Sequence, residues 1–239
     1  MFFKNFFQKT VLFLFLSIQQ AIFALNIESS KNWQIIDKEN NTVTLEYYEI
    51  NSIPDFFDIY QQLIPIEAQA FSDEIYNCLE NEECLNLMKD YILDQGLDVK
   101  SEIKIANSDR ETRLNHEIKK QQDRLELARQ ACMENSINFS KNYIILAKNS
   151  RNDILGFAMF EPKINQIINL GFLVIDPTYQ GLGLARHLIF SILDILPEFN
   201  KITLAAYNWN TKAKKIYEHL GFNVKIISRM TNEFEYTKN

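Results

Sequence analysis

The chain has 239 residues, of which 46% are hydrophobic and 23% are charged, and its formal net charge is −6. This length suits one large domain or two small ones, and the composition is globular, which excludes disordered, collagen-like and disulfide-scaffold chains. The acidic balance argues against a general nucleic-acid binder. The charge becomes −8 when residues 1–24, which contain two lysines, are removed.

The first residues have a cationic start, a short apolar run from Thr10 to Ile18, and an alanine at position 24. This order predicts a secretory signal peptide over residues 1–24, with cleavage after Ala24. The apolar run is shorter than the roughly 20 residues of a transmembrane helix. Export is therefore expected, with a membrane anchor or a cytoplasmic location as the alternatives.

Cysteines are few, and they occur at positions 78, 84 and 132. A bridge between Cys78 and Cys84 requires a helix break near Asn81, because six residues of continuous helix rise about 9 Å. No CxxC or HExxH spacing occurs, and the three histidines are scattered, so we expect no metal.

The first half of the chain predicts a β-hairpin followed by three helical segments. The hairpin pairs residues 33–37 with residues 42–50 around a polar turn. The first helix begins near Pro54, and Pro65 is expected to end or kink it. The second helical segment runs from Ser72 to about residue 96. A capping box, Ser108 to Glu111, begins the third helix, which continues to about residue 135.

The second half of the chain has a different pattern. Three apolar strands joined by turns predict a meander over residues 143–147, 154–160 and 167–175. A helix over 181–196, a strand over 202–207, a helix over 210–220 and closing strands over 223–230 and 234–237 follow. The sequence therefore predicts a mixed α/β domain over residues 25–239.

A glycine-containing turn delivers the chain from the third strand of this meander into the next helix. Gly181 and Gly183 allow the backbone to approach a ligand closely. The N–H groups at a helix start lack intrahelical acceptors and favour an anion such as a pyrophosphate. A dinucleotide-binding turn is excluded because Arg186 replaces the third glycine.

Two motifs in this region resemble those of the GNAT superfamily of N-acyltransferases. The first is Gln180-x-x-Gly183-x-Ala185, and the second runs from Asn210 through Ala213 and Tyr217 to Gly221-Phe222. The resemblance is clear over 143–236 and weaker over 42–71. It implies an α+β fold with a central, mostly antiparallel, splayed sheet flanked by helices, and makes residues 72–135 a helical insertion after the first helix.

The resemblance also implies roles for single residues with acetyl-coenzyme A as co-substrate. Tyr217 matches the proton donor to the departing thiolate, and Asn210 matches a position that touches the cofactor. The backbone of one strand would bind the pantetheine arm, and the glycine turn would hold the pyrophosphate. These cofactor-binding residues are Leu173, Val174, Ile175, Gly181, Leu182, Gly183, Leu184, Ala185 and Arg186. Asn210 and Gly221 also suit an ordinary helix N-cap and C-terminal glycine.

One position departs from the family's pattern. Ala205 occupies the place where many relatives carry a glutamate as general base. An amine with a pKa near 10 must lose a proton before it attacks, so a base, a water chain or a neutral substrate is needed. Glu161, Tyr207 and a water held by Asn169 are candidates.

These features favour an N-acetyltransferase that transfers an acetyl group to a primary amine by direct attack in a ternary complex. The alternatives are a non-catalytic acyl-coenzyme A-binding module and a membrane-tethered interaction protein. Residues 72–140 contain 15 acidic and 9 basic side chains. A cationic acceptor, such as a protein lysine, a protein N-terminus or a polyamine, is therefore expected.

Overall fold

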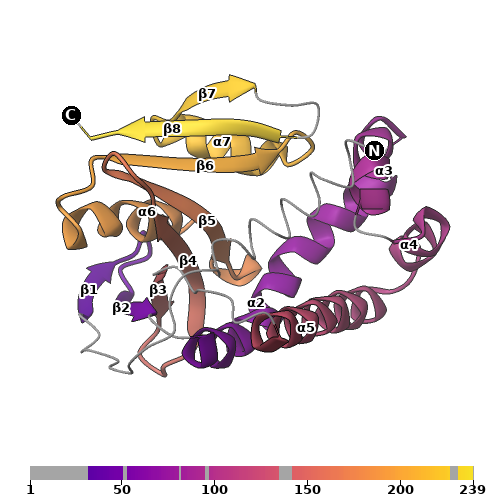
Figure 1. The fold of residues 1–239 in the computed structure, drawn as a ribbon, viewed down its shortest axis with the longest axis horizontal. Coiled ribbons are helices and arrows are strands. Elements are labelled where there is room, and N and C mark those ends of the chain that lie inside the picture. The colour runs from indigo at the N-terminus through magenta and orange to yellow at the C-terminus, as the bar shows by residue number, and fades with distance from the viewer. Residues whose placement is uncertain are drawn as a thin grey trace. The chain divides into compact units, whose positions relative to one another are not determined.

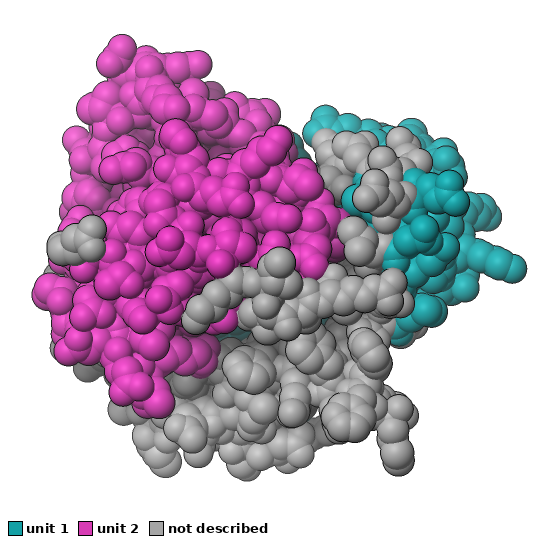
Figure 2. All heavy atoms as spheres, turned by 90° about the horizontal axis from the view of Figure 1, so that it is seen from above, with its two compact units in different colours: residues 1–24, 52–140 teal, residues 25–51, 141–239 magenta. Residues whose placement is uncertain are grey.

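The computed structural model describes residues 32–50, 53–80, 82–94, 97–134, 142–226 and 231–238. The predicted signal peptide, residues 1–24, lies outside this range. The described residues divide into a helical unit within 52–140 and a sheet unit within 25–51 and 141–239, shown in two colours in Figure 2. No described helix is both long and apolar enough to span a membrane.

The sheet unit is built on eight strands in the order β1-β2-β3-β4-β5-β6-β8-β7. Their bounds are β1 Asn32–Ile36, β2 Thr42–Ile50, β3 Asn142–Lys148, β4 Ile154–Pro162, β5 Ile167–Ile175, β6 Lys201–Tyr207, β7 Asn223–Ile226 and β8 Thr231–Thr237. All neighbours pair antiparallel except β5 and β6. The predicted α+β class, hairpin and meander are confirmed.

Three helical segments complete this unit: the short 3-10 helix η1 (Pro177–Tyr179), α6 (Leu184–Ile195) and α7 (Thr211–His219). One face of the sheet carries the hydrophobic core, in which α6 contributes Leu188, Ile189 and Ile192, all completely buried. Alternate strand residues point to this face, as the period of two of a β-strand requires. Side chains of the intervening residues therefore point to the opposite face.

The helical unit contains α2 (Ile53–Glu80), α3 (Glu82–Asp94), α4 (Val99–Ala106) and α5 (Arg110–Glu134). Pro65 does not end the first helix, and no second helix begins at Ser72, because α2 continues without interruption over 28 residues. The other expected effect, a kink at Pro65, stays a prediction. The prediction of a capping box that begins at Ser108 is also wrong, because the residue that caps the helix is Asp109. Asp109 accepts the Thr112 N–H at 2.8 Å, while the Ser108 hydroxyl donates to the Ile105 carbonyl.

A disulfide joins the end of α2 to the start of α3. The sulfurs of Cys78 and Cys84 are bonded, and their Cα atoms lie 5.2 Å apart. The expected break is present, since α2 ends at Glu80 and α3 begins at Glu82. The side chain of Cys132 lies outside the described residues.

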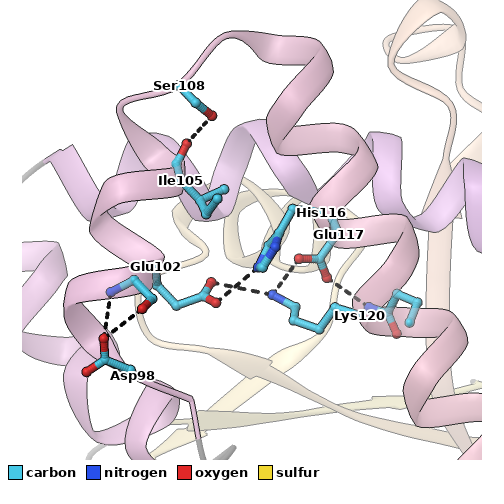
Figure 3. A network of polar contacts seen from close by, with 9 residues as sticks. Asp98, Glu102, Ile105, Ser108, His116, Glu117 and Lys120 are labelled. Atoms are coloured by element: carbon cyan, nitrogen blue, oxygen red, sulfur yellow. Dashed lines mark hydrogen bonds and ion pairs between the residues drawn. The ribbon is translucent and has the colours of Figure 1, made fainter.

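Carboxylates are buried inside the helical unit. Glu102 and Glu117 are 4% and 1% exposed, and Lys120 lies 3.7 Å and 2.5 Å from their oxygens (Figure 3). His116 contacts Glu102 at 3.1 Å. Glu67 of α2, also 4% exposed, accepts a 2.5 Å hydrogen bond from the Tyr60 hydroxyl. Burial raises the pKa of Glu67 to about 7, and the Glu117 carboxylate adds to this shift while the Tyr60 hydrogen bond opposes it.

Candidate active site

The two parallel strands of the sheet pair only over part of their length. β5 and β6 are in register from Ile167 opposite Lys201 to Leu170 opposite Leu204, and no pair follows between them. The register between β4 and β5 shifts at this point, so that Gly171 has no partner on β4. Such a bulge bends its strand and increases the local twist. Figure 1 shows β6 and β8 running away from β4 and β5 beyond this point, which opens a splay in the sheet.

The backbone of β5 lines this splay with alternate residues. The Asp176 N–H donates to the Leu155 carbonyl at 2.9 Å, so this antiparallel pair is hydrogen-bonded and the peptide groups alternate from it. The peptide groups of Val174 therefore face β4, and those of Leu173 and Ile175 face the splay. The Ile175 carbonyl already accepts from the Gln180 side chain at 3.1 Å. Leu173 and Ile175 therefore stay candidates for the expected pantetheine contacts, whereas the peptide groups of Val174 face β4.

The glycine turn lies at the start of α6, as the motif predicts. Gly181 and Gly183 have φ angles of +85° and +86°, a left-handed conformation that only glycine adopts at no steric cost. Gly183 is the N-cap of α6 and provides no side-chain cap. The first N–H groups of the helix, at Leu184 and Ala185, have no intrahelical acceptor and point at this end.

Cationic side chains surround this turn, and two of them come from elsewhere in the chain. The Lys38 N–H donates to the Leu182 carbonyl at 3.3 Å, and its side chain lies against Gly183. Lys212, from the first turn of α7, donates to the Gln180 side chain. Arg186 is exposed on α6 and lies over the Phe190 ring. Lys38 lies outside both motifs and Lys212 occupies an unspecified position of the second motif, and sequence reasoning missed both.

Asp37 holds Lys38 in this place. Its carboxylate is 6% exposed and accepts the N–H groups of Glu39 and Asn41 at 2.9 Å and 2.8 Å. This local pattern closes the β1–β2 turn, since aspartate side chains commonly accept from backbone groups shortly ahead of them. The hairpin therefore presents Lys38 to the start of α6 from a fixed turn.

The second motif forms α7 and both of its caps. Asn210 accepts the Ala213 N–H at 2.9 Å, so the expected N-cap role is confirmed. At the other end Gly221 has a φ of +89°, and the N–H groups of Gly221 and Phe222 donate to the carbonyls of Glu218 and Tyr217. These two bonds form a Schellman motif. The order of polar, aromatic and glycine residues thus specifies this helix directly.

Tyr217 lies in the core of the sheet unit. It is 8% exposed, and its ring packs against Phe222 and Phe234 with centroid distances of 5.8 Å and 5.3 Å. Phe234 on β8 pairs in register with Leu204, the last β6 residue that pairs with β5. The Tyr217 ring is therefore packed against the strand pair at which the splay begins.

The opposite face of the sheet carries polar side chains near the splay. Glu161 forms a 2.5 Å ion pair with Lys163 and is in register with Asn169. Tyr207 stacks on Trp209 at 5.2 Å between ring centroids. Glu161 and Asn169 lie level with the paired stretch of β5 and β6, whereas Tyr207 lies beyond it. Ala205 is the first β6 residue beyond the paired stretch.

A hollow of about 330 Å³ lies elsewhere on the sheet unit, along α6. It is lined by residues that include His187, Phe190, Tyr236 and Lys238, and Arg186 is its only predicted site residue. Burial and the nearby Arg186 lower the pKa of His187. The glycine turn and the strand splay do not line this hollow, so we place the candidate active site at the splay. No group of three or more metal-ligating side chains gathers in the described part of the chain.

Comparison with known protein structures gives low identities and partial coverage. Nourseothricin acetyltransferase is 17% identical with a TM-score of 0.37, covers 41% of this chain, and is matched over 66% of its own length. The PaiA N-acetyltransferase of Thermoplasma acidophilum, in complex with coenzyme A, is 13% identical with a TM-score of 0.47 and covers 80% of this chain and 98% of its own. The spermidine N-acetyltransferase SpeG of Vibrio cholerae is 20% identical with a TM-score of 0.37, over 48% and 73% of the two chains.

Sequence comparison gives a family match over part of the chain. No curated protein matches this chain. Residues 107–222 match the acetyltransferase (GNAT) family, a range that includes both motifs. It also includes α5, which lies within the insertion expected over residues 72–135. Over residues 107–222 the chain is therefore similar to the acetyltransferase domain of the GNAT family.

Proposed function

We propose that the protein transfers an acetyl group from acetyl-coenzyme A to a primary amine by direct attack in a ternary complex. One observation carries the proposal: the splay between β5 and β6 opens beside an α6 start that lacks a side-chain cap. Peptide groups of β5 that face the splay can hydrogen-bond the amide groups of an extended pantetheine arm. Free N–H groups and nearby cations suit its diphosphate.

Different residues would bind different parts of acetyl-coenzyme A. Leu173 and Ile175 would hydrogen-bond the pantetheine arm, and the backbone from Gly181 to Arg186 would hold the diphosphate. Lys38 and Lys212 would add positive charge beside that anion. Acetyl-coenzyme A, when bound, supplies an activated acetyl thioester. Tyr217 would donate a proton to the sulfur that leaves, and Asn210 would fix the start of α7 next to the cofactor.

A non-catalytic module that binds acyl-coenzyme A is the second candidate. It is favoured by Ala205, which provides no carboxylate at a position beside the splay. The two candidates share the cofactor site and differ only in turnover.

The acceptor we propose is cationic: a protein lysine, a protein N-terminus or a polyamine. The acidic excess over residues 72–140 supports this choice, because an acidic surface concentrates cations. Neutral and anionic amines should then be poorer acceptors than cationic amines of similar size. A preference for neutral amines would contradict the proposed acceptor class.

Calorimetry with acetyl-coenzyme A, followed by a thiol-release assay, tests the proposal. The amine panel contains spermidine, lysine ethyl ester, a lysine-containing peptide and a neutral aromatic amine. Binding with amine-dependent thiol release supports the enzyme, and binding without release supports the module. Absence of binding contradicts both.

We also propose that the protein is exported. The Cys78–Cys84 disulfide supports this location, because structural disulfides persist mainly in oxidising compartments. N-terminal sequencing of the protein from its own source is the test. A start at Leu25 supports export through a cleaved signal peptide, and a start at Met1 contradicts it.

A further inference from the structure

The strand opposite Ala205 supplies a carboxylate at the splay. Ala205 on β6 is in register with Glu233 on β8, so the two side chains point to the same face of the sheet. Directly paired antiparallel residues have Cβ atoms about 4.5–5.5 Å apart. Ala205 is exposed and small, and Glu233 is half-buried. The Glu233 carboxylate therefore has room to reach over Ala205 toward the opening between β5 and β6.

The face of the sheet on which Glu233 lies is the one an acceptor would approach. Leu204, Ala206 and Phe234 point to the core face beneath α6 and α7, with Tyr217 packed against Phe234. Glu233 is the neighbour of Phe234 on β8 and points to the other face. The start of α6 belongs to the core side, so an arm that passes through the splay from there presents its acyl end on the face of Glu233.

Other carboxylates on this face are already paired. Glu161 lies 2.5 Å from Lys163, and Glu235 lies 3.2 Å from Lys201. Lys225 on β7 occupies the register position on the other side of Glu233, and its side chain lies outside the described part of the structure. Among the side chains that are described, no ion pair to Glu233 is found. Glu161 pairs in register with Asn169, within the stretch where β5 and β6 are still joined, whereas Glu233 is in register with the first residue beyond it.

We propose that Glu233 is the catalytic base of this acetyltransferase and accepts a proton from the acceptor ammonium group. This inference rests on the proposed function. A proton moves from the ammonium nitrogen to the Glu233 carboxylate, and the neutral nitrogen then bonds to the acetyl carbonyl carbon as the carbon–sulfur bond breaks. The sulfur takes a proton from the Tyr217 hydroxyl. The second nitrogen proton and the proton held by Glu233 pass to solvent, and solvent returns one proton to Tyr217. The products are an amide, a free thiol and one released proton.

Glu233→Gln tests the assignment, and Glu235→Gln is its matched control on the same strand and face. With the best alkylamine of the panel at pH 7, Glu233→Gln should lower kcat/KM by about 10²- to 10⁴-fold, the range usual for a general base. The loss should shrink as the pH rises toward the amine pKa near 10, because the neutral amine no longer needs a base. Glu235→Gln should keep the activity and pH profile of the unmodified protein.

Two measurements besides activity complete the test. Calorimetry should give the same acetyl-coenzyme A affinity for both variants, and adding spermidine to the coenzyme A complex should shift a glutamate carboxyl ¹³C resonance that is missing in Glu233→Gln. An equal loss at every pH, or an unshifted resonance despite spermidine turnover, overturns the assignment of Glu233. If the unmodified protein binds acetyl-coenzyme A but acetylates no amine, the proposed function fails first, and the proposal for Glu233 fails with it.

Discussion

Replacing Glu67 should remove a specific part of the pH dependence of stability. Burial raises the pKa of Glu67 to about 7 from the ordinary 4.5, with Arg124 opposing the shift and Glu117 adding to it. The folded protein therefore binds this proton more tightly than the unfolded chain does. The stabilisation is fully present below pH 4.5 and is lost as the pH rises through about 7. At about 1.4 kcal/mol per pKa unit, the loss amounts to about 3 kcal/mol.

Glu67→Gln keeps a neutral side chain of the same shape at every pH. Urea unfolding followed by far-UV circular dichroism, between pH 4.5 and 8, measures the free energy of unfolding of both proteins. From pH 4.5 to 8, the free energy of unfolding of the glutamine variant should rise by about 3 kcal/mol relative to that of the unmodified protein. Glu126→Gln, an exposed change on α5, should follow the unmodified protein. Parallel curves for Glu67→Gln and the unmodified protein would refute the assignment of a neutral buried carboxyl group.

Three further predictions concern the active site and the disulfide. Tyr217→Phe removes only the hydroxyl, so it should lower kcat by about 10²- to 10⁴-fold with little change in acetyl-coenzyme A affinity or Tm. An unchanged kcat would mean that Tyr217 only packs in the core and donates no proton. Lys38→Met should weaken acetyl-coenzyme A binding by calorimetry about fivefold at low salt and less at high salt, since an exposed charge contributes about 1 kcal/mol; a salt-independent loss would indicate a folding effect instead. Cys78→Ser with Cys84→Ser should lower the free energy of unfolding by about 2 kcal/mol, the loop-closure value for so short a loop. As a control, reducing the disulfide of the unmodified protein should lower its free energy of unfolding by the same amount.

Local patterns predicted the parts of the fold that depend on nearby residues. Side chains within a few positions of one another determine three such parts. These are the α7 caps at Asn210 and Gly221, the glycine turn before α6, and the β1–β2 hairpin. Pro65 misled the prediction because a proline costs an isolated helix several kcal/mol, and tertiary packing of an amphipathic face offsets such a cost.

The parts that sequence reasoning missed depend on distant segments. Lys38 meets Leu182 across the fold, and nothing within the β1–β2 turn specifies that contact. The bulge at Gly171 is a mismatch between two strands and is not a property of either strand alone. Glu233 lies opposite Ala205 only because of the β6–β8 register, which a single strand sequence does not contain.

That register gives the proposed base a structural support independent of the cofactor. Phe234, next to Glu233, is completely buried in the core beside Tyr217. A slip of one residue along β8 would bring Phe234 to the open face and place a carboxylate in the core, at a cost of several kcal/mol. The packing of Phe234 therefore keeps Glu233 on the acceptor face, and the same strand supports Tyr217 on the other. The two proposed proton-transfer groups are thus held on opposite faces by neighbouring residues of β8, while β5 is left to diverge and admit the cofactor.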